Sequence, residues 1–178
     1  MRMIGKKGQV WVETVIYTLI GLAIIALVLA AALPKINAKK DEVMIEQSIE
    51  ALSNINSKVY EVFYKPEGNN RIVDLEIRKG ALIINMDDNT VSWILDSSFL
   101  YSQENEEIAV GNVYVNTTRG KPWQVELKLN YSDMNITYND DSTGTKRLDI
   151  APNPYKLAIS KTIPTVSGNP IINFAESG

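Results

Sequence analysis

The stretch that decides the fold runs from Val15 to Leu33 and reads VIYTLIGLAIIALVLAAAL, nineteen residues without a charge. At about 1.5 Å per residue, a helix of this length covers about 28 Å, close to the roughly 30 Å of a bilayer's hydrocarbon core. A helix buried in a globular core normally shows a polar stripe, and Thr18 and Gly21 are too small and too few to form one. We therefore expect this stretch to span a membrane rather than to lie in a soluble core.

The flanks of this stretch predict its orientation. Three basic residues precede it: Arg2, Lys6 and Lys7. Three lysines follow it closely: Lys35, Lys39 and Lys40. The positive charges on the two sides of the span are almost equal in number, so they do not by themselves predict its orientation. A long polar domain translocates largely regardless of its charge, so the orientation follows from the short basic segment before the span. We expect a single-pass protein of the cell membrane with a cytoplasmic N-terminus and an extracellular C-terminal domain.

An ordinary secretory signal peptide is the first alternative, because Ala30-Ala31-Ala32 offers an A-x-A cleavage pattern. The apolar stretch is longer than the roughly 7–15 residues usual in such signals, and a carboxylate, Glu13, stands at its edge. A carboxylate costs about 2.5–3.5 kcal/mol at the centre of a membrane helix, so residues of this kind are functional candidates. Glu13 therefore argues against a simple secretory signal.

The junction before the helix resembles a known processing site. Its residues are Lys6, Lys7, Gly8 and Gln9. Together with Glu13 and the long apolar helix, they resemble the class III signal peptide of archaeal type IV pilin-like proteins. In that family a membrane-embedded prepilin-type peptidase, an aspartic protease, cuts after the glycine on the cytoplasmic side and leaves the apolar helix on the mature protein. The resemblance implies a leader over residues 1–8, cleavage between Gly8 and Gln9, and the type IV pilin architecture.

Cleavage after Gly8 would create a new ammonium group on Gln9, and a helix starting there places Glu13 one turn further along the same face. That carboxylate could neutralise its own terminus, or meet the ammonium group of a neighbouring chain as apolar helices bundle and so set their axial register. The alternative is an acid near a helix N-terminus, favoured by the macrodipole by about 0.3–1 kcal/mol. We expect Glu13 to be the assembly residue of a transmembrane and assembly helix over residues 9–34.

The residues after Pro34 predict a continuation of the helix over residues 35–65. Apolar residues recur there at three- and four-residue spacing: Ile45, Ile49, Leu52, Ile55 or Asn56, Val59, and Val62 or Phe63. Fewer than three clean heptads are present, so this stripe favours packing on the chain's own sheet over a coiled coil. The segment from Lys65 to Gly68 supplies the stop and the turn.

From residue 66 to residue 161 the sequence consists of short β-rich runs separated by turn residues. The first three runs, 71–78, 81–86 and 90–95, predict a three-strand meander. Further strands are expected at 108–115, 123–129, 134–138, 146–150 and 155–159. Residues 162–178 are broken by prolines and a glycine and predict an extended tail with one short strand at 171–174. The fold class is therefore α+β, with the helix packed on an antiparallel sheet or small sandwich.

The composition of the chain excludes several classes of functional site. The 178 residues include no cysteine and no histidine, which excludes disulfides, thiolate zinc sites and imidazole catalysis. Eighteen basic residues against 21 acidic ones give a net charge of −3, which lacks the basic footprint of a nucleic-acid binder. We expect no nucleic-acid partner, no cofactor and no enzymatic activity.

Three features of the β-rich part carry weaker signals. Asp87-Asp88-Asn89 and the cluster at 139–142 could hold calcium, but turn chemistry explains both without a metal. Three sequons are candidates for N-glycosylation if this part lies outside the cytoplasm: Asn116, Asn130 and Asn135. Trp93 and Trp123 are expected in the core rather than on a ligand platform.

These observations predict a membrane-anchored, pilin-like surface subunit whose partners are the membrane, a prepilin-type peptidase and other pilin subunits. The alternative is a non-polymerising accessory or minor pilin-like ectodomain that binds a partner or a surface. The family pattern Q-x-S-x-E-x-x-x-L is incomplete here, because Trp11 stands at the serine position and Tyr17 at the leucine position. The two hypotheses differ in whether the processed protein forms filaments.

Overall fold

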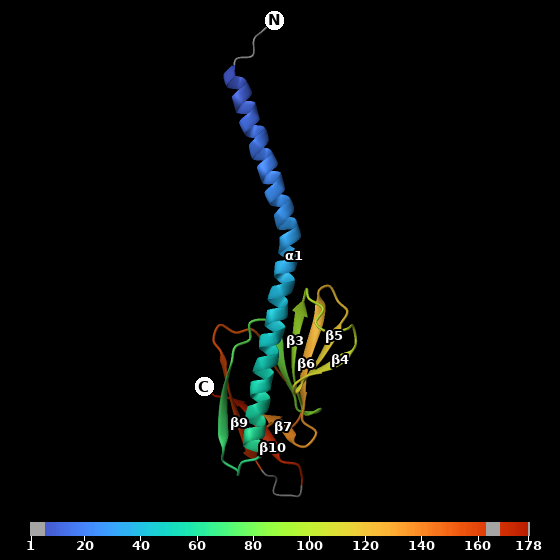
Figure 1. Ribbon diagram of the computed structural model, residues 1–178. Coiled ribbons are helices and arrows are strands. Elements are labelled where there is room, and N and C mark those ends of the chain that lie inside the picture. The colour runs from blue at the N-terminus through green and yellow to red at the C-terminus, as the bar shows by residue number, and fades with distance from the viewer. Residues whose placement is uncertain (1–5, 163–167, 178) are drawn as a thin grey trace. The chain divides into compact units, whose positions relative to one another are not determined.

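The computed structural model describes residues 6–162 and 168–177 (Figure 1). Within these residues one helix, α1 (Lys6–Phe63), precedes ten strands, so the α+β class is confirmed. The chain divides into two compact units, Met1–Lys39 and Lys40–Gly178, and the boundary falls inside α1. Pro34 lies within α1, as expected of a proline that costs the helix a hydrogen bond without ending it.

The part of α1 in the second unit is amphipathic and packs on the sheets, as the sequence predicts. Six apolar residues of the expected stripe are buried: Ile45, Ile49, Leu52, Ile55, Val59 and Val62. They belong to one hydrophobic cluster that also contains the inward-facing residues of both sheets. At about 1.5–3 kcal/mol per buried aliphatic side chain, this stripe is a major source of the stability of the unit.

The C-terminal end of α1 is capped by a residue distant in sequence. The last turn has no basic residue of its own, although its free carbonyl groups favour a positive charge. Lys161 fills this role, because its Nζ donates to the carbonyl oxygen of Phe63 at 2.7 Å and to that of Lys65 at 3.3 Å. The helix end and the later strand are therefore fastened together.

The smaller sheet has four strands in the order β1-β9-β10-β7. Their bounds are β1 (Asn70–Leu75), β9 (Tyr155–Thr162), β10 (Ile171–Glu176) and β7 (Asn135–Tyr138). The pairs β1/β9 and β9/β10 are antiparallel, whereas β10 and β7 are parallel. The strand expected at 171–174 is present, but the surrounding segment is not the tail that the sequence suggested. Ile172 and Phe174 are fully buried, so β10 is an interior strand; residues 163–167 lie outside the described part.

The larger sheet has six antiparallel strands in the order β4-β5-β6-β3-β2-β8. Their bounds are β4 (Glu107–Val110), β5 (Val113–Thr118), β6 (Trp123–Asn130), β3 (Thr90–Ser97), β2 (Ala81–Asn85) and β8 (Thr145–Leu148). Two expectations were wrong here. The three-strand meander does not form, because β1 pairs with β9 in the other sheet. The run 108–115 is two strands, since Gly111, at φ 62°, turns the chain into a β4–β5 hairpin.

Gly80 shows how tightly the turn before β2 is built. Its φ is +79°, in the left-handed region that favours glycine. A Cβ at this position would collide with the carbonyl oxygen of Ile94 and stand 2.8 Å from the Cβ of Leu95. The turn therefore requires glycine both for its backbone angle and for the close approach of β3.

The two tryptophans expected in the core differ. Trp93 on β3 is only 2% exposed, and its Nε1 donates to the carbonyl oxygen of Lys79 at 2.9 Å. Trp123 at the start of β6 is half-buried. The core expectation is confirmed for Trp93 and holds only in part for Trp123.

Candidate functional site

The first part of α1 presents apolar side chains that nothing in the described chain covers. Leu27 is 72% exposed, Ile24 is 56% exposed and Leu33 is 52% exposed. Among the described residues one helix is long and apolar enough to cross a membrane, and its apolar window near the N-terminus contains no buried residue. Soluble monomers rarely expose so continuous an apolar surface. The exposed apolar surface of this segment is consistent with a single-pass membrane protein.

The expected processing residues lie at the start of this helix. Lys6, Lys7, Gly8 and Gln9 are all in the helical backbone of α1. Because α1 spans Lys6–Phe63, the Gly8–Gln9 bond lies close to its N-terminal bound.

Glu13 is exposed and lies well inside the helix. The first turn of α1 contains no acidic residue, so the macrodipole, whose effect fades within that turn, does not account for Glu13 in the full-length chain. Gln9 and Glu13 are four residues apart in continuous helix, which puts them on the same face. The backbone thus has the geometry that an ammonium group on Gln9 would need to reach this carboxylate.

A polar cluster near the start of the second unit was not predicted from the sequence. One carboxylate oxygen of Asp41 accepts a hydrogen bond from Lys79 Nζ. The other accepts from the backbone nitrogen of Ser98 at 2.7 Å and from its hydroxyl at 2.6 Å. Burial acts to raise the pKa of Asp41, but these hydrogen bonds to Lys79 and Ser98 outweigh it and hold the pKa below its ordinary value. The cluster joins α1 to the turn before β2 and to the segment after β3.

The three sequons occupy different environments. Asn116 is half-buried on the interior strand β5, and its Oδ1 is buried without a partner among the described residues. Asn130 at the end of β6 and Asn135 at the start of β7 are exposed. Asn130 and Asn135 are therefore the more accessible of the three sequon side chains.

The acidic clusters are turns in the structure. The side chain of Asn85 accepts hydrogen bonds from the backbone nitrogens of Asp87 and Asp88, and Asn89 has φ 51°. Asn139 and Asp140 also have positive φ. Within the described part of the chain there is no group of three or more acidic, histidine or cysteine side chains placed to hold a metal ion.

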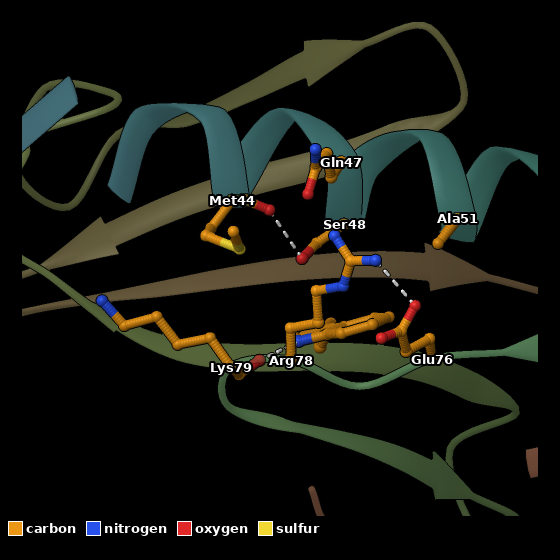
Figure 2. Close-up of a pocket in the computed structure, with 8 residues that line it drawn as sticks. Met44, Gln47, Ser48, Ala51, Glu76, Arg78 and Lys79 are labelled. Atoms are coloured by element: carbon orange, nitrogen blue, oxygen red, sulfur yellow. Dashed lines mark hydrogen bonds and ion pairs between the residues drawn. The ribbon is translucent and has the colours of Figure 1, made fainter. Parts of the chain in front are cut away.

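A cleft of about 250 Å³ lies beside α1 (Figure 2). Its apolar wall includes Met44, Ala51 and Trp93. Its three charged residues are already paired: Arg78 Nη2 lies 2.8 Å from Glu76 Oε2, and Lys79 pairs with Asp41. The Lys79–Asp41 pair links the turn before β2 to α1, whereas the Arg78–Glu76 pair lies on the exposed segment between β1 and β2.

No protein-family model matches the chain, and no curated protein or solved structure matches it either.

Proposed function

We propose that this chain is a membrane-anchored, pilin-like surface subunit. In this proposal a prepilin-type peptidase removes residues 1–8 after Gly8. The apolar part of α1 then anchors the subunit in the cell membrane as a single pass, with the β-rich unit outside the cell. Subunits assemble through this helix into an extracellular type IV pilus-like filament, and the chain performs no catalysis.

The observation that carries the proposal is the contrast within α1. Helical structure is continuous from Lys6 to Phe63, yet the buried stripe begins only at Ile45. An apolar helix segment without a covering sheet can be covered first by lipid and later by the same segment of neighbouring subunits. A simple membrane anchor needs no exposed carboxylate, whereas a helix that packs on its own copies can use one to set register.

Glu13 is assigned this role in the proposal. Opposite charges about 4 Å apart are worth about 4 kcal/mol at an effective dielectric of 20, before the cost of desolvation. An ammonium group on Gln9 of a neighbouring subunit would supply the positive charge. The pair forms only at one axial offset between helices, so it selects one packing among many that apolar contacts alone would allow.

The test is the variant Glu13→Gln, which keeps the size of the side chain and removes its charge. We expect normal membrane insertion and normal cleavage after Gly8, with a clear loss of subunits from filaments by electron microscopy and sheared-fraction immunoblotting. Glu50→Gln is the matched control, because Glu50 is an exposed acid on the same helix beyond the apolar segment. Normal filament yield from Glu13→Gln would remove Glu13 from the mechanism.

Two aromatic residues favour the accessory role as the second candidate. Trp11 is 70% exposed and Tyr17 is 71% exposed at the start of the apolar segment. Amphipathic rings of this kind concentrate at membrane–water interfaces, where they hold a helix in the bilayer. The accessory role would be supported if the wild-type protein is processed, stays in the membrane fraction and forms no filaments.

A further inference from the structure

A second cleft, of about 450 Å³, lies between the C-terminal part of α1 and the larger sheet. It is larger than the cleft of Figure 2 and within the range of about 300–1,000 Å³ typical of ligand sites. Three tyrosines and three asparagines line it: Tyr60, Tyr64, Tyr114, Asn56, Asn112 and Asn130. None of its lining residues is charged.

The tyrosines offer flat apolar surface to a ligand. Tyr64 is 77% exposed and Tyr114 is 43% exposed. Tyr60 and Tyr64 are stacked, with ring centroids 6.0 Å apart and an angle of 27° between the ring planes. Behind them the ring of the fully buried Tyr131 lies 6.4 Å from that of Tyr60. The aromatic wall is therefore anchored in the core, and the ring of Tyr64 is left to solvent.

The asparagines supply donors and acceptors in the same cleft. Asn56 is only 7% exposed and lines the cleft from α1. Asn112 and Asn130 are exposed at the same cleft. Each amide presents both a donor group and an acceptor atom.

We propose that this cleft binds a neutral saccharide. A pyranose ring has an apolar face that stacks on aromatic rings, and its neighbouring hydroxyl groups pair with the donor and acceptor of an amide. The absence of charged residues from the lining disfavours phosphates and carboxylates, which require a cationic partner. The proposal goes beyond filament assembly, because every residue involved lies in the Lys40–Gly178 unit.

The saccharide could come from two sources. It could be a free or surface-borne sugar, or an N-glycan attached to Asn130, which lines the cleft and opens the sequon Asn130-Tyr131-Ser132. An attached glycan would lay its first sugars on the tyrosine wall. The chemistry of recognition is the same in both cases.

The first experimental arm uses the full chain, made in a host without N-glycosylation and placed in phosphatidylcholine nanodiscs. Maltotriose, chitotriose and mannotriose are the probes, and saturation-transfer NMR with titration reports binding. We expect at least one probe to bind, Tyr64→Ala to weaken it at least tenfold, and Tyr64→Phe to retain it. Ile150→Ala, at an exposed isoleucine outside the cleft, should leave binding unchanged. So should Glu13→Gln, which separates this proposal from the filament role.

The second arm uses the chain from a glycosylating host. If the source is the attached glycan, the Asn130 glycan should resist endoglycosidase more than the Asn135 glycan, and Tyr64→Ala should abolish that difference. Either positive arm supports the proposal and identifies the source. Failure of all three probes to bind the unglycosylated chain, together with no protection of an Asn130 glycan, would overturn it. Binding that survives both Tyr64→Ala and Tyr114→Ala would also overturn it.

Discussion

Two leucines on one helix summarise the difference between the two parts of this molecule. Leu52 is fully buried against the sheets, whereas Leu27 is 72% exposed. Both belong to α1, and both favour helix to a similar degree. The comparison teaches that helical structure and burial are separate properties here: the second part of α1 is covered by its own chain, and the first part depends on a cover from outside.

The strongest test of this contrast is to truncate each leucine. Leu52→Ala should lower the free energy of unfolding of the β-rich unit by about 2–5 kcal/mol, because it opens a cavity in a packed core. Leu27→Ala should change it by less than about 0.5 kcal/mol. Urea denaturation of the full chain in detergent, followed by tryptophan fluorescence, measures both. Equal losses would show that the first part of α1 belongs to the core of the folded unit.

Much of this contrast could be predicted from the sequence, because it depends on local periodicity. The stripe from Ile45 to Val62 repeats at helical spacing, and most strands are bounded by turn residues. Strand partners could not be predicted in this way. The alternation in β1 shows which side chains face inward, but does not reveal that its neighbour is β9, far along the chain. For the same reason the sequence predicts the strand at 171–174 but not its place between β9 and β7.

The candidate sites divide in the same manner. Glu13 was identifiable because a charge beside an apolar helix is costly wherever it occurs. The proposed saccharide cleft was not, because it joins Tyr60 on α1 and Tyr64 just after it to Tyr114 on a distant strand. The local signal was the four-residue spacing of Tyr60 and Tyr64. The Asp41 cluster likewise requires Lys79 and Ser98 to be brought together by the fold.

Introducing a charged residue into the exposed apolar part of α1 tests whether lipid covers that part. Ile24→Arg should oppose membrane insertion by about 2.5–3.5 kcal/mol and shift the protein from the carbonate-resistant membrane fraction to the soluble or aggregated fraction. Ile150→Arg is the matched control, since Ile150 is 61% exposed in the β-rich unit. If Ile24→Arg fractionates with the membrane as completely as wild type, lipid is not the cover of this segment.

Low pH should reduce the unfolding free energy of the β-rich unit, because it protonates Asp41. Because the folded pKa of Asp41 lies below its ordinary value, its stabilising contribution is complete above about pH 5, where the unfolded carboxyl is also ionised. It is lost as the pH falls through the lower folded pKa. Asp41→Asn should lower the unfolding free energy by about 1–2 kcal/mol at pH 7 and flatten its decline at acid pH. Urea midpoints between pH 2 and pH 7 test this, with the exposed Asp96→Asn as control; an unchanged acid profile would contradict it.

The smallest expected effect concerns the end of the helix. Lys161→Met keeps the length of the side chain but removes the hydrogen bonds to the carbonyl groups of Phe63 and Lys65. We expect a loss of about 1 kcal/mol, together with faster amide exchange in the last turn of α1. Lys156→Met, at an exposed lysine of the same strand, should have no such effect. Equal exchange rates in both variants would show that Lys161 does not cap the helix.

The most direct measurement of the central claim is the N-terminal residue of the protein recovered from cells, determined by mass spectrometry. We expect a mature chain that begins at Gln9 and retains the whole apolar segment from Val15 to Leu33. An intact Met1 would make the protein a simple signal-anchored one. A mature start at or beyond Ala32 would contradict the account outright, because the exposed part of α1 would then be a discarded secretory signal.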